Sequence, residues 1–206
     1  MDKLNLSKKK KVSSSNSSCP TSSFTICPNC NREANLTLIS KEIPNFGELL
    51  FSTVSCDFCK FKFSDVMSLT AHKPSVFSFN ICSDKDFSIK IIRSASATVK
   101  FRELEVDIEP GSFSQGYFTN AEGLLARVLE SFRIILNSGS LSYKEKEILS
   151  SKIDYVDAVL NGKSCLHIEI FDPLGNSNVV GGIVKKRNLS PKEASQYKAG
   201  ISFLDY

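Results

Sequence analysis

The chain has 206 residues, seven cysteines, 41% hydrophobic residues and a formal net charge of +4. This length allows one or two domains with a real apolar core. No apolar run approaches the ~20 residues that a membrane-spanning helix needs, and the lysines near the N-terminus have no apolar stretch behind them that would mark a secretory signal. We therefore expect no membrane association, and the sequence predicts a cytoplasmic protein with reduced thiols.

The positive charge is concentrated at the N-terminus. The first 26 residues hold five lysines against Asp2 alone, so the rest of the chain carries 21 basic and 21 acidic residues. A balanced body does not favour binding to nucleic acid. Residues 1–23 are rich in Lys, Ser and Asn, which predicts a disordered basic tail. Its Lys8–Lys11 run fits a solvated tail better than RNA contact or nuclear import, and Cys19 is predicted to be a free thiol.

Two Cys-x-x-Cys pairs, separated by 25 residues, stand near the start of the body. Thiolates in such pairs converge on one tetrahedral zinc ion, and four of them leave no open position for water or substrate. The sequence therefore predicts one structural Zn2+ per chain, while an iron or iron–sulfur centre and a redox role remain alternatives. The predicted ligands are Cys27, Cys30, Cys56 and Cys59.

A small zinc ribbon is predicted over residues 24–72. The segments 35–43 and 48–55 suit strands, a turn lies between them, and residues 61–69 continue extended after the second pair. Asn31 and Lys60 follow the two pairs, where a left-handed residue is common, and a lysine adopts that conformation only at some cost. His72 is an alternative metal ligand, although a surface position is favoured.

A β domain is predicted over residues 73–186. Apolar and polar residues alternate in several segments, as in half-buried strands, and a change of phase near Arg102 and Glu103 indicates a bend. Cys82 and Cys165 are predicted to be buried thiols within strands. Asp172 and Asn176 are predicted to bond their own turn. The predicted strands are 76–81, 87–92, 97–108, 165–171 and 178–184.

A helical period interrupts this domain over about residues 119–161. Thr119 to Glu122 and Ser142 to Glu145 both match the capping box, and Gly162 suits a helix end. The pattern predicts an α-helical hairpin inserted into the β domain. The predicted fold class is mainly β (α+β), and residues 187–206 are predicted to be a loosely attached tail.

The sequence offers little for catalysis. A phosphate-binding loop is missing, because Gly181-Gly182 lacks the Lys-Ser/Thr that such a loop requires. No serine lies in a nucleophile elbow. The two histidines, His72 and His167, do not make a His/carboxylate set for a metalloenzyme. His167 falls in a predicted strand and is interpreted as a satisfied histidine. We therefore expect that the protein is not an enzyme.

Four stretches, in this order, resemble the ZPR-type zinc-finger proteins, and together they cover about residues 25–185. The chain has one such module, as archaeal relatives do. It departs from the family pattern at Phe101-Arg102-Glu103-Leu104, which lacks the Pro that usually precedes Glu-Leu. It also departs after the second cysteine pair, at Cys59–Val66. The matching stretches are Ile43–Glu48, Arg93–Val99 with Glu103–Gly111, Asn120–Leu125 and Asp172–Ser177.

The resemblance implies a four-cysteine zinc ribbon followed by a double-stranded β-helix, barrel-like domain with a helical hairpin. It also implies protein binding, with translation elongation factor one-alpha as the client of a folding or assembly factor. The alternatives are a zinc-ribbon protein bound to RNA or the ribosome, and a β-barrel metalloenzyme whose ligands are missing. Candidate partner contacts in the matching stretches are Asn45, Phe46, Glu48, Arg93 and Arg102.

Overall fold

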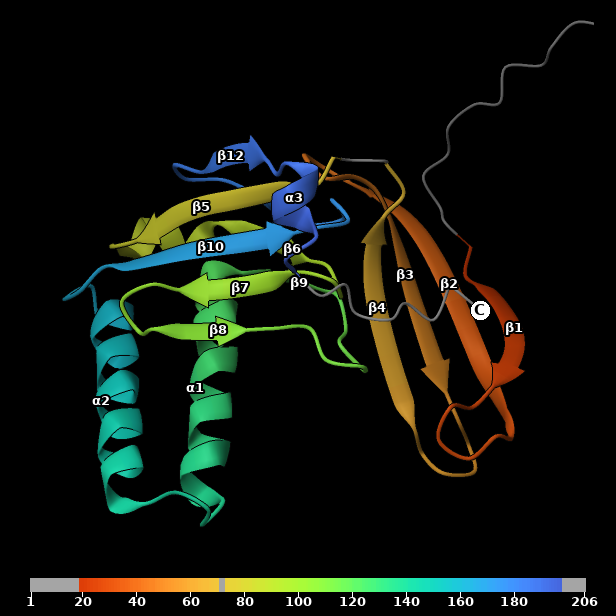
Figure 1. The fold of residues 1–206 in the computed structure, drawn as a ribbon. Helices are drawn as coiled ribbons and strands as arrows, with labels where there is room; N and C mark the ends of the chain where they lie inside the picture. The colour runs from red at the N-terminus through yellow and green to blue at the C-terminus, as the bar shows by residue number, and fades with distance from the viewer. Residues whose placement is uncertain (1–18, 71–72, 198–206) are drawn as a thin grey trace, which may run out of the picture.

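The computed structural model describes residues 19–70 and 73–197. A four-stranded antiparallel ribbon stands beside a larger β domain, from which two helices project (Figure 1). The predictions for His72, for most of the N-terminal tail and for the last nine residues lie outside the described residues. Among the described residues, no helix combines the length and apolar character that crossing a bilayer requires.

The ribbon is a meander in which each strand pairs with the next along the chain. Its second and third strands match the prediction, but its first strand begins inside the segment 1–23 that was predicted to be disordered. Phe24 and Ile26 in that strand are 70% and 72% exposed, so backbone pairing with the second strand, rather than apolar burial, holds it. The strands are β1 (Thr21–Ile26), β2 (Glu33–Ile43), β3 (Gly47–Ser55) and β4 (Lys62–Ser68).

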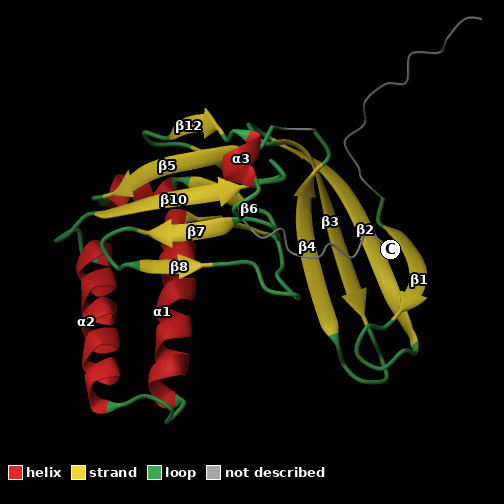
Figure 2. Cartoon of the chain, in the orientation of Figure 1, coloured by secondary structure: helices red, strands yellow, loops and turns green. Residues whose placement is uncertain are grey.

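The β domain is a jelly roll built from two antiparallel sheets (Figure 2). The larger sheet has the order β12-β5-β10-β7-β8, and the smaller has the order β11-β6-β9. Apolar side chains of both sheets and of the helices share one core, which includes Phe79, Ile91 and Ile168. The strands are β5 (Ser75–Ile81), β6 (Lys90–Arg93), β7 (Thr98–Phe101), β8 (Val106–Ile108), β9 (Tyr117–Asn120), β10 (Leu166–Asp172), β11 (Asn178–Val180) and β12 (Lys185–Asn188).

One predicted strand is divided in the structure, one begins later than predicted and one ends earlier. The segment 97–108 is a hairpin, because Glu105 adopts a φ of 50° and the chain reverses between β7 and β8. Asp84–Ser88 is a short 3-10 helix, η1, so β6 begins only at Lys90. Gly181 and Gly182 both have positive φ, which ends β11 and starts β12 in the other sheet.

The helical hairpin is confirmed as α1 (Ala121–Asn137) and α2 (Tyr143–Leu160). The capping box at Ser142 and Glu145 is present, and Gly162 follows the second helix with a φ of 68°. The first predicted box is wrong. Asn120, not Thr119, caps α1, and its Oδ1 accepts a 2.8 Å hydrogen bond from the amide of Gly123.

From residue 187 to Tyr197 the chain packs on the β domain, so the prediction of a loosely attached tail is wrong for this part. β12 pairs with β5 along the edge of the larger sheet, and Leu189 is buried. The short helix α3 (Pro191–Ala194) follows, capped by Ser190 and Glu193. The Tyr197 ring then stacks on Phe171 with centroids 4.8 Å apart. These contacts join the segment to the outer face of the larger sheet.

Cys82 and Cys165 form a disulfide with their Cα atoms 4.2 Å apart, which corrects the prediction of two buried thiols. Both lie outside the strands. Cys82 follows β5 and Cys165 precedes β10, and the adjacent residues Ile81 and Leu166 are register partners. Cys165 is exposed. The pairing of two cysteines also differs from the expectation of a fully reduced chain. Cys19 is free and exposed, as predicted.

The ribbon and the jelly roll meet at β4 and β9. The carboxylate of Asp65 in β4 accepts a 2.6 Å hydrogen bond from the amide of Gly116, just before β9. Phe46 at the β2–β3 turn contacts Phe118 of β9 edge to face, with centroids 5.5 Å apart. Ile92 of β6 packs in the same small core as Phe46. Polar and apolar contacts therefore fix the two parts together.

Candidate functional site

The four predicted cysteines come together at one end of the ribbon. Their sulfur atoms all lie within 4.8 Å of one another. The Sγ atoms of Cys27 and Cys59 are 3.6 Å apart, as are those of Cys30 and Cys56. In a tetrahedral site with metal–sulfur bonds of about 2.3 Å, the sulfur atoms are roughly 3.8 Å apart. The chain thus positions four thiols for one metal ion.

Two similar turns hold these thiols. In the first, the amide of Asn31 donates to the carbonyl of Cys27 at 2.9 Å, and in the second Lys60 donates to Cys56 at 3.0 Å. Asn31 and Lys60 have φ values of 57° and 60°. Both are therefore left-handed, as the sequence predicted, because the chain must turn back under each pair of sulfur atoms.

The chemistry of the donors suits a borderline-soft cation such as zinc. Hydrogen bonds from the Asn29 side chain and the Phe61 amide are the main influences on Cys59, and they lower the pKa of its thiol to about 6. These hydrogen bonds favour the thiolate form of Cys59, which is the form that binds a metal. All four coordination positions of a tetrahedral ion would be filled by the chain, which gives the site a structural character.

The five residues predicted as partner contacts are not all accessible. Asn45, Glu48 and Arg102 are exposed, and Arg102 forms an ion pair with Glu169. Phe46 and Arg93 are only 4% exposed each. Phe46 belongs to the core between the ribbon and the jelly roll. The expectation that Phe46 and Arg93 are exposed contacts is therefore wrong.

Arg93 instead organises a buried polar network that the sequence did not reveal. Its Nη1 donates to the Ser114 hydroxyl at 2.8 Å and to the Gln115 carbonyl at 3.1 Å. Its Nη2 donates to the Ala97 carbonyl at 2.7 Å. Burial lowers the pKa of the guanidinium, whereas Tyr117 and the carboxylates of Asp172 and Asp65 raise it. The network fixes the loop before β9 against β6 and the loop that follows β6.

Asp172 organises a second buried polar network beside the first. Its buried carboxylate accepts hydrogen bonds from the hydroxyls of Ser94 and Ser96, at 3.0 Å and 3.1 Å. The amides of Leu174, Gly175 and Ser177 also donate to it. The prediction that Asp172 bonds its own turn is correct, but the carboxylate also holds the loop between β6 and β7.

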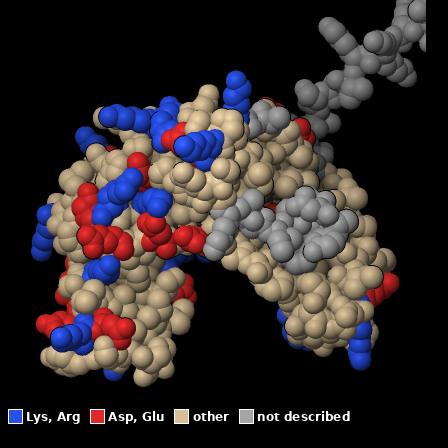
Figure 3. Space-filling view, in the orientation of Figure 1, with Lys and Arg blue, Asp and Glu red and all other residues tan. Residues whose placement is uncertain are grey.

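An open groove with a volume of about 560 Å³ lies between the ribbon and the jelly roll. Its lining includes two arginines, Arg93 and Arg127, and no aspartate or glutamate. Figure 3 shows the surface hollowed between the helical hairpin and the ribbon. Aromatic and aliphatic side chains from both domains line the groove. They are Phe51 and Val66 of the ribbon, Phe113 of the loop before β9, and Phe118 of β9.

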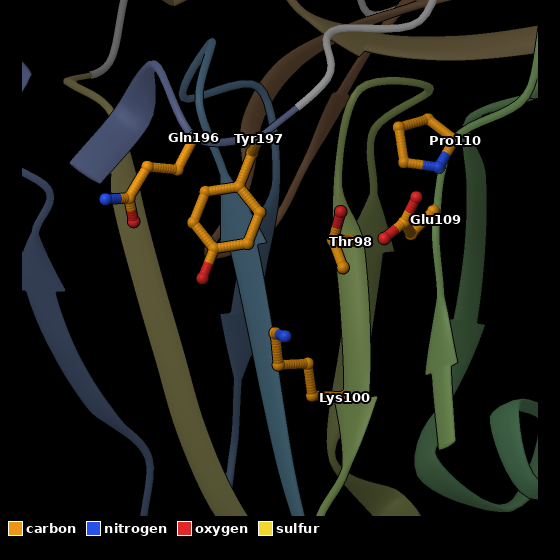
Figure 4. A pocket seen from close by; sticks show the side chains of 6 residues that line it. All are labelled: Thr98, Lys100, Glu109, Pro110, Gln196 and Tyr197. Carbon is orange, nitrogen blue, oxygen red and sulfur yellow. The ribbon is translucent and has the colours of Figure 1, made fainter. Parts of the chain in front are cut away.

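A second pocket of about 300 Å³ lies against the larger sheet. Figure 4 shows Lys100 and Thr98 on β7, facing Tyr197 and Gln196 of the C-terminal segment. Lys100 Nζ donates to Asp107 Oδ2 at 2.6 Å, and it lies 5.9 Å from the centre of the Tyr197 ring. The cation therefore already has partners within the chain.

His167 lies on the outer face of the larger sheet, where it contacts two side chains of β5. Its Nε2 is 3.2 Å from the Ser78 hydroxyl, and its Nδ1 is 2.5 Å from Asn80 Oδ1. Its neighbours along β10, Leu166 and Ile168, point into the core. The interpretation of His167 as a satisfied histidine is therefore confirmed.

The same two-part architecture is found in known proteins. Residues 21–74 match the ZPR1 zinc-finger domain, and residues 85–196 match the ZPR1 jelly-roll domain. The chain belongs to the ZPR1 family. Each domain model matches once, which confirms the single module inferred from the resemblance. It also confirms the predicted fold class, in which a ribbon with four cysteines precedes a β domain with a helical insertion.

Relatives of the chain include single-module and longer proteins. A ZPR1-like protein of Pyrococcus horikoshii is 33% identical over 84% of this chain and 80% of its own length. One from Methanocaldococcus jannaschii is 30% identical over 87% of this chain and 91% of its own. The zinc finger chaperone zpr1 of Schizosaccharomyces pombe is 30% identical over 50% of this chain and 23% of its own.

Proposed function

We propose that this protein is a zinc-dependent folding or assembly factor, and that translation elongation factor one-alpha is its client. The zinc ion would be held by the four cysteines of the ribbon and would act structurally. The proposal also holds that the protein has no catalytic activity of its own and works in the cytoplasm. Membership of a family that includes a protein named as a zinc finger chaperone supports the general part of this proposal.

The observation that carries the proposal is the exposed apolar end of the helical hairpin. Ile134 and Ile135 near the end of α1 are 65% and 45% exposed. Tyr143 and Ile148 at the start of α2 are 82% and 56% exposed. Large apolar side chains gathered on one exposed feature typically mark a protein-binding surface. The other end of the hairpin is anchored, because Val156 and Val159 are fully buried.

The charge distribution suits a protein partner better than nucleic acid. Figure 3 shows basic and acidic side chains interspersed over the jelly roll and the hairpin, and the visible face of the ribbon is mostly uncharged. A surface that binds nucleic acid through its phosphates would gather basic residues on one face. The mixed charges instead leave apolar contact as the main source of affinity.

A binding experiment with the protein's own elongation factor tests the proposal. The zinc-loaded chain is mixed with newly synthesised or mature factor, with and without guanine nucleotide. We expect a complex that favours the incompletely folded or nucleotide-free factor. The double variant Ile134→Ser, Ile148→Ser should weaken this complex at least tenfold, because two exposed apolar contacts are lost.

The matched control is Ile183→Ser, which removes an isoleucine that is 86% exposed in the loop between β11 and β12. This variant should bind as the unmodified chain does. Absence of any complex at tens of micromolar would refute the client, because even weak specific interfaces are occupied at that concentration. Equal weakening by Ile183→Ser would refute the role of the hairpin.

A further inference from the structure

We propose that the groove between the ribbon and the jelly roll binds an extended segment of a protein client, in which a carboxylate side chain lies beside an apolar one. This inference rests on the proposed function in that it gives the client a second docking site, away from the tip of the hairpin. The groove is bounded by β3 and β4, by β9 with the loop before it, and by α1.

The apolar walls of the groove come from both domains. Phe51 of β3 and Val66 of β4 are directly opposite in the ribbon's register and form one wall. Phe118 and Phe113 line the other side and are 43% and 62% exposed. Aromatic side chains at the centre of a concave surface are typical anchors of protein interfaces. The volume of about 560 Å³ is enough for one or two client side chains.

The charge of the groove favours a carboxylate next to the apolar side chain of the client. Arg127 is exposed on α1, its guanidinium carbon lies 4.4 Å from the centre of the Tyr117 ring, and it forms no ion pair within residues 19–70 and 73–197. A stacked guanidinium still offers N–H donors at its edge, which suit a carboxylate. The lining contains no acidic side chain, so a carboxylate of the client could approach Arg127 directly.

Arg93 adds to the back of the same groove. Its guanidinium carbon is 5.7 Å from the centre of the Tyr117 ring, and its Nε is buried without a hydrogen-bond partner among the described residues. A buried N–H group without an acceptor destabilises the folded chain. The attraction of the nearby Asp65 for Arg93 offsets part of its charge, so Arg127 contributes most of the selectivity.

The groove is formed before a client arrives. The bonds from Arg93 to Ser114 and Gln115 fix the loop that carries Phe113, and the bond between Gly116 and Asp65 ties that loop to the ribbon. A rigid site loses less conformational entropy on binding. Single-stranded nucleic acid would need a track of cations along its backbone. Two arginines, one of them buried, fit a single carboxylate better.

Selection from a random twelve-residue peptide library displayed on phage, with the full zinc-loaded chain as bait, tests this proposal. We expect the selected peptides to contain Asp or Glu beside Phe, Leu or Ile. Synthetic copies should bind Arg127→Glu at least tenfold more weakly, because a charge-assisted hydrogen bond becomes a repulsion. Arg133→Glu, which reverses an exposed charge further along α1, should change binding less than twofold.

The proposal is overturned if the selected peptides lack acidic residues, or if Arg127→Glu binds them as tightly as Arg133→Glu does. If an oligouridylate competes with the peptides, the ligand of the groove is RNA and not a protein segment. If the chain forms a dimer that Arg127→Glu dissociates, the ligand is a second copy of the chain. Binding of the peptides only to a chain that ends at Tyr197 would identify the chain's own C-terminal residues as the occupant.

The proposal for the client and the proposal for the groove can be refuted independently. Peptide binding without a complex of the elongation factor would refute the client and leave the groove. A complex with the elongation factor that Arg127→Glu does not weaken would refute the groove and leave the client. Far-ultraviolet circular dichroism of both variants is the check on folding, and we expect an unchanged spectrum because both arginines are exposed on α1.

Discussion

The carboxylate of Asp65 accepts a hydrogen bond from the backbone amide of Gly116, and this bond joins the ribbon to the jelly roll at a point where the two backbones nearly touch. A methyl group added at Gly116 would lie 2.5 Å from the carbonyl oxygen of Val66 and 2.5 Å from the carboxylate of Asp65. Only glycine fits this position without displacing β4 or the loop before β9.

We therefore expect Gly116→Ala to lower the free energy of unfolding by about 1–3 kcal/mol, because forced overlap in a packed region costs that much. Urea denaturation measures the change. Gly111→Ala in the same loop is the matched control, since a methyl group there would meet no atom within 4 Å. Equal stability of the two variants would show that the two domains separate easily at this point.

The ionisation of Asp65 should make stability depend on pH. Burial is the main effect and raises its pKa above the ordinary value of 3.8, against the opposing effects of Gly116, Val66 and Arg93. At pH values between the unfolded and the folded pKa of Asp65, the folded state holds a proton on this carboxyl that the unfolded state has released. The resulting stabilisation is complete below pH 3.8 and is lost as the pH rises through the folded pKa.

Asp65→Asn removes this titration and keeps an oxygen that accepts from Gly116. The difference in unfolding free energy between the original chain and this variant should therefore fall as the pH rises above 3.8. Measurement of both proteins over the same pH series cancels the loss of metal in acid, since both have the same four thiols. A difference that grows with pH would mean that the electrostatic attraction of Arg93, together with the hydrogen bonds to Asp65, outweighs burial.

Asp172 should be among the most sensitive positions in the chain. Asp172→Ala would leave five donors without their acceptor in a site that is 0% exposed. We expect a loss of about 3 kcal/mol or more, because each buried unsatisfied donor costs about 1–3 kcal/mol. Thermal and urea unfolding measure it. Asp107→Ala, which breaks a surface pair with Lys100, should cost at most about 1 kcal/mol.

Metal content provides the test of the cysteine site. Purified protein should contain one zinc ion, and Cys56→Ser should release it, because a hydroxyl is a poor replacement for a thiolate. The ribbon should then unfold, since small zinc modules draw their folding free energy from the metal. Cys19→Ser is the control and should retain the zinc. Full zinc content in Cys56→Ser would contradict the four-thiolate site.

Because of the disulfide, we expect the stability of the folded chain to fall when a reducing agent is added. It joins positions 83 residues apart, and a cross-link over such a loop stabilises the folded state by up to about 4 kcal/mol in the chain-entropy model. Cys82→Ser should therefore unfold at lower urea concentration than the oxidised chain, and a reductant should no longer affect it. Identical stability with and without reductant in the unmodified chain would show that the pair is not oxidised in solution.

Local rules in the sequence were enough to predict the metal site and the helical hairpin. Two cysteine pairs, each followed by a residue that can turn left-handed, define the site without reference to the rest of the chain. Ser142 and Glu145 likewise mark a helix start through contacts within four residues. Asn120 was missed because Thr119 also matches the pattern, and only the hydrogen bond from the Gly123 amide to Asn120 shows which of the two residues caps the helix.

Features that depend on distant residues were not predictable in the same way. A charged residue such as Arg93 is usually exposed, and its burial follows from acceptors at Ala97, Ser114 and Gln115, which approach only in the folded chain. Cys82 and Cys165 become neighbours because β5 pairs with β10 across the whole hairpin insertion. The groove arises from five segments that no local pattern connects, namely β3, β4, β6, β9 with the loop before it, and α1.

The strand order of the larger sheet has a consequence for synthesis on the ribosome. β5 lies between β10 and β12, both of which leave the exit tunnel after the hairpin has been made. The ribbon pairs only with its own neighbours in sequence, so it can fold early. For about ninety residues of translation, β5 therefore has no strand beside it in this sheet, and the nascent chain carries an unpaired apolar edge that a chaperone could recognise.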